Sequence, residues 1–189
     1  PPLHPVLVAT KLTGTGGQHA ALMQQFNHLQ VIIALLRDGF HPHSQGGTVQ
    51  LDDAGQPVLD YPISDYLWQG MREALLAMAE LQFAAGAKQV LPIHHDAKLY
   101  NSWPEAKAAI QQLSMQKLRQ TVVSAHVMGG CNMSVSPAKG VVDQNGRHHQ
   151  LQNLSVFDGS VLPTSLGANP QLTIYALVWR NCQQLIKAL

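Results

Sequence analysis

His126 is the residue of this chain that most directly suggests chemistry. It lies in the segment SAHVMGGCNM, residues 124–133, ahead of a glycine pair, a cysteine and a methionine. An imidazole can bind a transition metal, accept a proton as a general base near neutral pH, or lie in a core with its nitrogens hydrogen-bonded. Each interpretation requires different partners elsewhere in the chain.

The other histidines and the cysteines argue against a metal. The chain has ten histidines and two cysteines, Cys131 and Cys182, which lie far apart. Neighbouring histidines cannot easily surround one tetrahedral ion without further ligands, and no carboxylate-histidine helix motif accompanies them. Three close pairs occur, and they are His41 with His43, His94 with His95, and His148 with His149. We therefore expect no metal site, and the phosphate-loop and serine-hydrolase motifs are also absent.

The composition predicts a globular chain and does not indicate a highly charged binding partner. Its 189 residues are 46% apolar, enough for a real core, and only 12% are charged, with a net charge of +1. This balance provides no electrostatic footprint for nucleic acid or an anionic membrane. The longest apolar run, residues 31–36, is far shorter than the ~20 residues of a membrane span. Two distant cysteines favour a reducing compartment and leave one disulfide possible.

The pattern of apolar residues and turn residues predicts a mixture of helices and hairpins. Without regular strand-helix alternation, it favours an α+β fold with a mixed or mostly antiparallel sheet over a doubly wound parallel sheet. Helices are expected over 19–36 with Gly39 as the C′ residue, from Ser64 to about 85 with Gly86 as its stop, from Ser102 to about 119, and from Pro170 to about 189. Strands are expected as a hairpin over 47–61, an edge strand over 88–93, a hairpin around Asn145-Gly146, and a short strand over 154–157.

Six short motifs after residue 124 give the chain a family resemblance. They are His126-x-x-Gly129-x-Cys131-x-Met133, Gly140-Val-Val-Asp143, Asn145-Gly146-Arg147, residues 153–160 with Asp158-Gly159, Pro163-Thr-Ser165, and Asn169-Pro-Gln-Leu-Thr-Ile174. Their order and approximate spacing resemble the C-terminal signature of the glucose-methanol-choline (GMC) oxidoreductases. The resemblance is sharp over 124–189 and looser over 1–120. It implies a substrate-binding region over 1–120 and a catalytic segment over 121–189.

The resemblance implies oxidation of an alcohol CH–OH group by hydride transfer to FAD. The motif histidine of the family falls on His126, which is then expected to accept the hydroxyl proton as a general base. The second family position falls on Asn169, expected to hydrogen-bond the substrate oxygen or merely to cap the terminal helix. Asp158 and Gly159 are expected along the ribityl-phosphate part of FAD or as an ordinary turn. The helix start at Asn169, Pro170 and Gln171 is expected to face the flavin pyrimidine, so that this helix completes the FAD domain.

One family element is absent from the chain. No Gly-x-Gly-x-x-Gly opens a strand-helix unit that could hold the FAD pyrophosphate. We therefore expect a C-terminal fragment that lacks the N-terminal FAD-binding domain, holds FAD weakly if at all, and is inactive when isolated. The start Pro1-Pro2 has no targeting character, and the cytoplasm is the default compartment. The alternative function is a flavin-free, non-catalytic domain of the same fold that binds metal through its histidine pairs.

Overall fold

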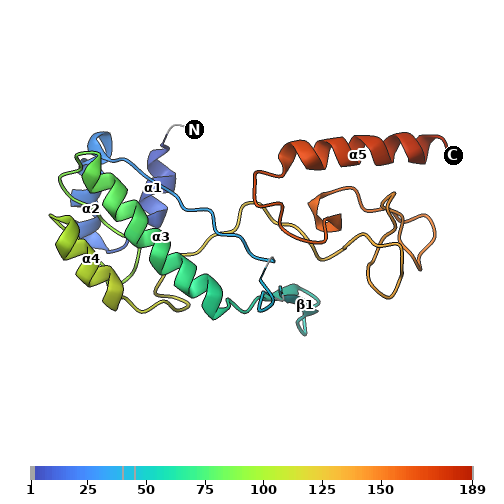
Figure 1. Cartoon of the computed structure of the whole chain (residues 1–189), viewed down its shortest axis with the longest axis horizontal. Coiled ribbons are helices and arrows are strands. Elements are labelled where there is room, and N and C mark those ends of the chain that lie inside the picture. Colours follow the sequence, from blue (N-terminus) through green and yellow to red (C-terminus); the bar gives the residue numbers. More distant parts are fainter. Residues whose placement is uncertain (1–2, 40, 45, 189) are drawn as a thin grey trace. The chain divides into compact units, whose positions relative to one another are not determined.

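The computed structural model describes residues 3–39, 41–44 and 46–188, and it confirms the predicted α+β class. The chain divides into two compact units. Unit 1 consists of Pro1–Leu36 and Ile63–Val123, and unit 2 consists of Arg37–Pro62 and Ser124–Leu189. Unit 1 is mainly helical, whereas unit 2 combines one long helix with a hairpin and many turns (Figure 1).

The helices of unit 1 begin and end at residues with the expected local chemistry. They are α1 (Pro5–Lys11), α2 (Gly16–Gln24), the 3-10 helix η1 (Phe26–His28), α3 (Asp65–Ala84) and α4 (Trp103–Gln112). The hydroxyl of Ser64 accepts a hydrogen bond from the Leu67 amide at the start of α3, and Gly86, with φ +93°, follows its end. The predicted start and end of this helix are confirmed.

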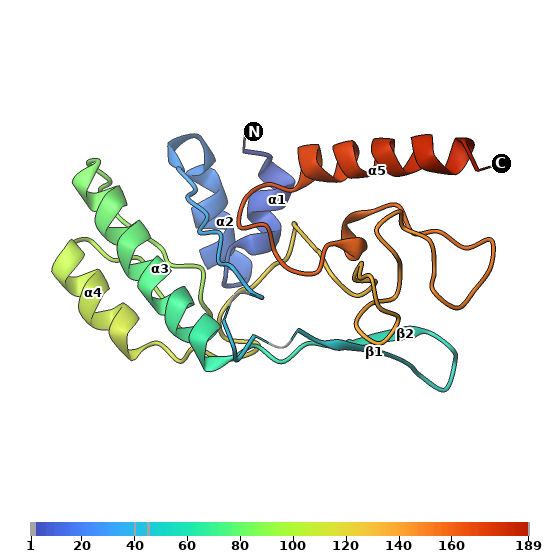
Figure 2. The same cartoon turned by 45° about the vertical axis from the view of Figure 1, so that its right-hand side comes forward.

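The core of unit 1 lies between α3 and α4, which run side by side (Figures 1 and 2). Arg72 on α3 donates hydrogen bonds to the carbonyl oxygens of Ile110 and Gln111, which satisfies acceptors at the end of α4. Seven buried residues form the cluster, and they are Leu75, Ala79, Val90, Tyr100, Ala106, Ile110 and Leu113.

Two helix predictions in unit 1 were wrong in extent. The helix predicted over 19–36 ends at Gln24, and the segment after η1 is non-helical, since the run Val31-Ile32-Ile33 is β-branched and favours extended backbone. Gly39 is therefore not a C′ residue. The helix predicted to reach 119 ends at Gln112, because Leu113 turns to extended backbone with ψ 139° and buries its side chain in the core.

Unit 2 contains the hairpin that the turn residues predict. Strands β1 (Thr48–Leu51) and β2 (Pro57–Asp60) pair antiparallel, with Thr48 opposite Asp60. Asp52 Oδ1 accepts hydrogen bonds from the Ala54 and Gln56 amides, and Gly55 adopts φ +75°. Every residue of both strands is exposed. Figure 2 shows the hairpin edge-on.

The other strand predictions were wrong. At each of those positions the structure has only isolated β-bridges. Val90 pairs with Tyr100, Val142 with His148, and Arg147 with Ser155. The Asn145-Gly146 turn is present, with Gly146 at φ +79°. The ladder stops after one bridge because the chain bends at once: His148 Nδ1 accepts hydrogen bonds from the amides of the second and third residues that follow it.

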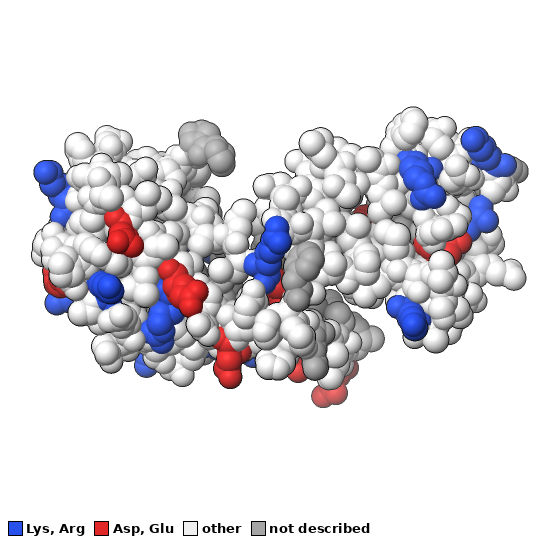
Figure 3. Space-filling model, viewed as in Figure 1, with Lys and Arg blue, Asp and Glu red and all other residues white. Residues whose placement is uncertain are grey.

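Helix α5 (Gln171–Ile186) follows the 3-10 helix η2 (Gly159–Val161) and confirms the predicted terminal helix. Among the described residues, no helix combines the length and the apolar character that crossing a membrane requires. Lysine and arginine side chains are scattered among acidic and uncharged residues on the face shown in Figure 3. This distribution agrees with the small net charge of the chain.

Candidate functional site

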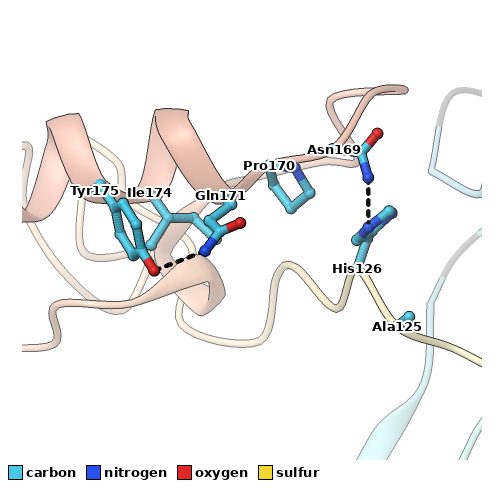
Figure 4. Close-up of a pocket in the computed structure, with 7 residues that line it drawn as sticks. All are labelled: Ala125, His126, Asn169, Pro170, Gln171, Ile174 and Tyr175. Atoms are coloured by element: carbon cyan, nitrogen blue, oxygen red, sulfur yellow. Dashed lines mark hydrogen bonds between the residues drawn. The ribbon is translucent and has the colours of Figure 1, made fainter. Parts of the chain in front are cut away.

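His126 and Asn169 lie in contact although 43 residues separate them in the sequence. The Asn169 side-chain nitrogen Nδ2 is 3.0 Å from Nε2 of His126 (Figure 4). An amide NH₂ group donates, so the contact suits the His126 tautomer in which Nε2 carries no proton. The contact therefore places an imidazole lone pair beside an amide donor, which are the two groups that proton removal from a hydroxyl requires.

A hollow of about 300 Å³ surrounds this contact at the start of α5. It is lined by Ala125, His126, Asn169, Pro170, Gln171, Ile174 and Tyr175. Within it, the Gln171 side-chain nitrogen donates to the Tyr175 hydroxyl oxygen at 2.7 Å, and the carboxamide oxygen points away from Tyr175 (Figure 4). The hollow thus combines polar groups with the apolar side chains of Pro170 and Ile174, as small-molecule sites commonly do.

The segment that carries His126 is held by η2. The amide of Cys131 donates to the Ser160 carbonyl at 3.0 Å, and the amide of Met133 donates to the Val161 carbonyl at 2.8 Å. Gly159 is buried, and a Cβ there would lie 2.9 Å from Cδ1 of Ile174 on α5. Because a side chain at Gly159 would separate these elements, η2 holds the histidine segment next to α5.

Asp158 and Gly159 have structural roles in this arrangement and do not line the hollow. The Asp158 carboxylate accepts hydrogen bonds from the amide of Ser160 at 2.8 Å and from its hydroxyl at 2.5 Å. It thereby caps η2, while packing against Ile174 accounts for the glycine. The turn interpretation describes both residues, and their contact with a cofactor stays a prediction.

The start of α5 differs from the capped helix start that Asn-Pro predicts. The N-cap residue is Pro170, no side chain caps the helix, and the Asn169 amide contacts His126 instead. The capping alternative for Asn169 was therefore wrong. The first amide groups of α5 lack a side-chain acceptor and carry the positive end of the helix dipole. Together with the amides of Asn169 and Gln171, this donor set fits the carbonyl-bearing edge of a flavin.

His94 and the two cysteines have ordinary structural surroundings. His94 is fully buried; its Nε2 contacts the Ser114 carbonyl and its Nδ1 accepts from the Asp96 amide. Cys131 and Cys182 are free and half-buried. Among the residues that the structure describes, no group of three or more histidine, cysteine or acidic residues is placed to hold a metal ion.

Sequence reasoning missed Ala125, Ile174 and Tyr175 as residues of the hollow. Tyr175 lies four positions after Gln171, and residues at this spacing share a helix face. The spacing from Gln171, already a candidate, was therefore a usable signal. Ile174 lies three positions after Gln171, so the same spacing also indicated it.

Comparisons with known proteins place most of the chain in one family. The sequence model of the family described as GMC oxidoreductase matches residues 42–177. A long-chain-alcohol oxidase of Arabidopsis thaliana is 28% identical over 187 residues, which are 95% of this chain and 24% of that protein. A GMC-type oxidoreductase of Sinorhizobium fredii is 27% identical, with 74% of this chain and 27% of that protein covered. A cholesterol oxidase of Acinetobacter baumannii is 43% identical over 84 residues, 44% of this chain and 14% of that protein. The chain spans about a quarter of the length of the first two relatives.

Proposed function

Because the chain belongs to the GMC oxidoreductase family, we propose that it is the C-terminal part of an FAD-dependent enzyme that oxidises the CH–OH group of an alcohol. The observation that carries the proposal is the contact of His126 with Asn169 in the hollow at the start of α5. The names of the relatives, a long-chain-alcohol oxidase and a cholesterol oxidase, support a substrate with an alcohol group. In this proposal, residues 1–120 serve substrate binding and residues 121–189 complete the FAD site.

His126 is the base of the proposed reaction. Its Nε2 contacts the Asn169 amide, and a substrate hydroxyl that displaces this contact would meet the Nε2 lone pair. Removing that proton makes the neighbouring carbon a better hydride donor. A positioned general base contributes about 10²- to 10⁴-fold in rate. The histidine is half-buried, so a substrate hydroxyl can reach it from the hollow.

Asn169 orients the substrate oxygen. When a hydroxyl enters, Nδ2 of Asn169 donates to its oxygen while Nε2 of His126 accepts its proton, so both groups act on one O–H bond. An amide cannot act as a base, and its contribution is therefore orientation and stabilisation of negative charge on the oxygen. This division of roles requires one base in the site and not two.

The cofactor would lie against the start of α5. Pro170, Gln171 and the uncapped first turn of the helix would hold the flavin ring, with Asp158 and Gly159 on the ribityl-phosphate side. Bound FAD supplies the hydride acceptor for the reaction. The N-terminal FAD-binding domain of the longer protein is the proposed partner, since the chain has no dinucleotide-binding glycine motif.

The base assignment is tested by rapid-mixing kinetics on the full-length protein. His126→Ala should slow flavin reduction by the alcohol about 10²- to 10⁴-fold while FAD stays bound. The matched control is His43→Ala, because His43 is an exposed histidine of unit 2 outside the hollow. An unchanged reduction rate in His126→Ala would remove the base assignment.

The alternative function is a flavin-free, non-catalytic domain that binds metal through histidine pairs. Two measurements on the full-length protein distinguish this alternative from the proposed function. They are the flavin absorbance and the metal content after chelator treatment. We expect flavin and no bound metal. For the isolated chain we expect no stoichiometric flavin, because the pyrophosphate-binding motif lies outside it, and stoichiometric flavin there would contradict the proposed division of the FAD site.

A further inference from the structure

Two segments of unit 2 that are far apart in the sequence cross just before Asn169. One is Arg37–Gly39, which we name the clamp, and the other is the loop 164–167. Arg37 Nη2 donates to the Gly167 carbonyl at 3.3 Å, and the Thr164 hydroxyl donates to the Gly39 carbonyl at 3.0 Å. The two hydrogen bonds join residues 130 and 125 positions apart.

Both crossing points carry a glycine whose backbone has a positive φ. Gly167 has φ +68°, and a Cβ added to it would overlap the Arg37 guanidinium. Gly39 has φ +99°, and a Cβ added there would lie 2.8 Å from the Thr164 hydroxyl oxygen. An L-residue with a side chain rarely adopts either backbone conformation. Gly39, which a helix end could not explain, is thus explained by its positive φ next to Thr164.

The clamp is also bonded to the hairpin, through Asp38. Asp38 accepts hydrogen bonds from the Gly39 amide at 2.9 Å and from the Tyr61 hydroxyl. Burial, and then the hydrogen bond and negative charge of Asp38, raise the pKa of Tyr61 to about 12. Tyr61 directly follows β2, so the hairpin holds one end of the clamp in place. The clamp is therefore hydrogen-bonded both to the loop 164–167 and to Tyr61 at the end of the hairpin.

The loop ends only two residues before Asn169, whose side chain meets His126. Pro170, the next residue, is buried and starts α5, so the backbone of Asn169 is held from the helix side as well. We propose that Arg37 is a positioning residue of the reaction, which sets the Asn169 amide against the substrate oxygen through Gly167. This inference rests on the proposed function, in which Asn169 orients the hydroxyl between the base and the cofactor.

The proposal predicts a kinetic effect that an ordinary stabilising contact would not produce. Small displacements of a positioned group cost up to about 10²-fold in rate. In the full-length protein, Arg37→Met should lower the limiting rate of flavin reduction about tenfold, with a smaller change in the alcohol concentration for half-saturation. Arg37→Lys, which keeps a donor on a flexible stem, should restore part of the rate. The matched control is Arg180→Met, because Arg180 donates to the Gln144 carbonyl in the same unit and should leave the rate unchanged.

A double-variant cycle tests whether Arg37 acts through Asn169. Residues that act as one unit are not additive. In an Asn169→Ala background, Arg37→Met should therefore change the reduction rate less than twofold. Hydrogen exchange of the 164–169 peptide should still accelerate, because the Arg37–Gly167 hydrogen bond is lost. Full additivity of the two rate effects overturns the inference, and so does faster exchange in Arg37→Met with a normal reduction rate. A normal reduction rate in Asn169→Ala alone removes the role of Asn169, and this inference with it, whereas absence of flavin reduction by the alcohol in the unaltered full-length protein would overturn the proposed function.

Discussion

Unit 1 has a cluster of seven buried residues around α3 and α4, whereas the buried apolar side chains of unit 2 among the described residues are Val142, Val161, Leu162 and Pro170. Unit 2 is organised instead by side chains that bond its own turns. Asp52, Asp143, Asp158 and His148 each accept two hydrogen bonds from groups a few residues away. Such bonds define local conformation but bury little apolar area.

This difference explains why unit 2 carries the candidate site. A loop-rich region can bring together residues from distant segments, as it does for His126 and Asn169, because no dense core dictates their spacing. The same region leaves apolar side chains exposed. On α5 they are Leu172, Tyr175, Trp179 and Ile186, which follow one helix face.

The largest expected effect is on the core of unit 1. Ile110 is fully buried, so Ile110→Ala should lower the free energy of unfolding by about 2–5 kcal/mol. Urea unfolding followed by circular dichroism measures it. Leu81→Ala on α3 is the control, since Leu81 is 58% exposed and should cost less than about 0.5 kcal/mol. If both variants lost the same free energy of unfolding, the α3–α4 cluster would not be the source of stability in unit 1.

The next effect is on the packing that holds the site in unit 2. Gly159→Ala places a methyl group 2.9 Å from Ile174 and 3.1 Å from the Val127 carbonyl, which should cost about 1–3 kcal/mol. It should also slow flavin reduction in the full-length protein, because the histidine segment and α5 are forced apart. Gly17→Ala is the control, since nothing lies within 4 Å of a Cβ there. Unimpaired reduction in Gly159→Ala would show that η2 does not set the site.

A smaller effect is expected on the exposed face of α5. Trp179 is 69% exposed, so Trp179→Gln should change the free energy of unfolding of the isolated chain by less than about 0.5 kcal/mol. It should nevertheless reduce binding of a fluorescent hydrophobic dye, because the exposed apolar area shrinks. Gln184→Ala on the same helix should leave dye binding unchanged. If dye fluorescence is insensitive to Trp179, the apolar surface that distinguishes unit 2 lies elsewhere.

The smallest effect is a pH dependence at Tyr61. Its pKa is raised from 10.0 to about 12 by burial and by Asp38, so folding favours the protonated hydroxyl. The resulting stabilisation is complete below pH 10 and is lost as the pH rises through about 12. Tyr61 is half exposed, so the effect on stability should be small. Absorbance titration at alkaline pH should show one late tyrosine, and Tyr61→Phe should remove that step; its persistence would assign it to another tyrosine.

Where a local signal was complete, the sequence predicted the structure well. Ser64 and Gly86 predicted the ends of α3, and Asp52 with Gly55 predicted the hairpin turn. Where packing decides, prediction was wrong. Residues 19–36 have helical spacing of apolar side chains, yet the β-branched run after Leu29 is not helical, and the expected strands beyond the hairpin became single bridges.

The sequence by itself determined the family, because the order of the short motifs can be read along the chain without knowing which residues are in contact. It also determined the caps and turns, because their hydrogen bonds reach only a few residues along the chain. Only the tertiary structure decided that Asn169 contacts His126 instead of capping α5, that Gly159 is needed for packing against Ile174, and that Arg37 lies on Gly167. The physical reason is separation in the sequence. These contacts join residues from 15 to 130 positions apart, and at such distances local conformational preference does not determine which side chains meet.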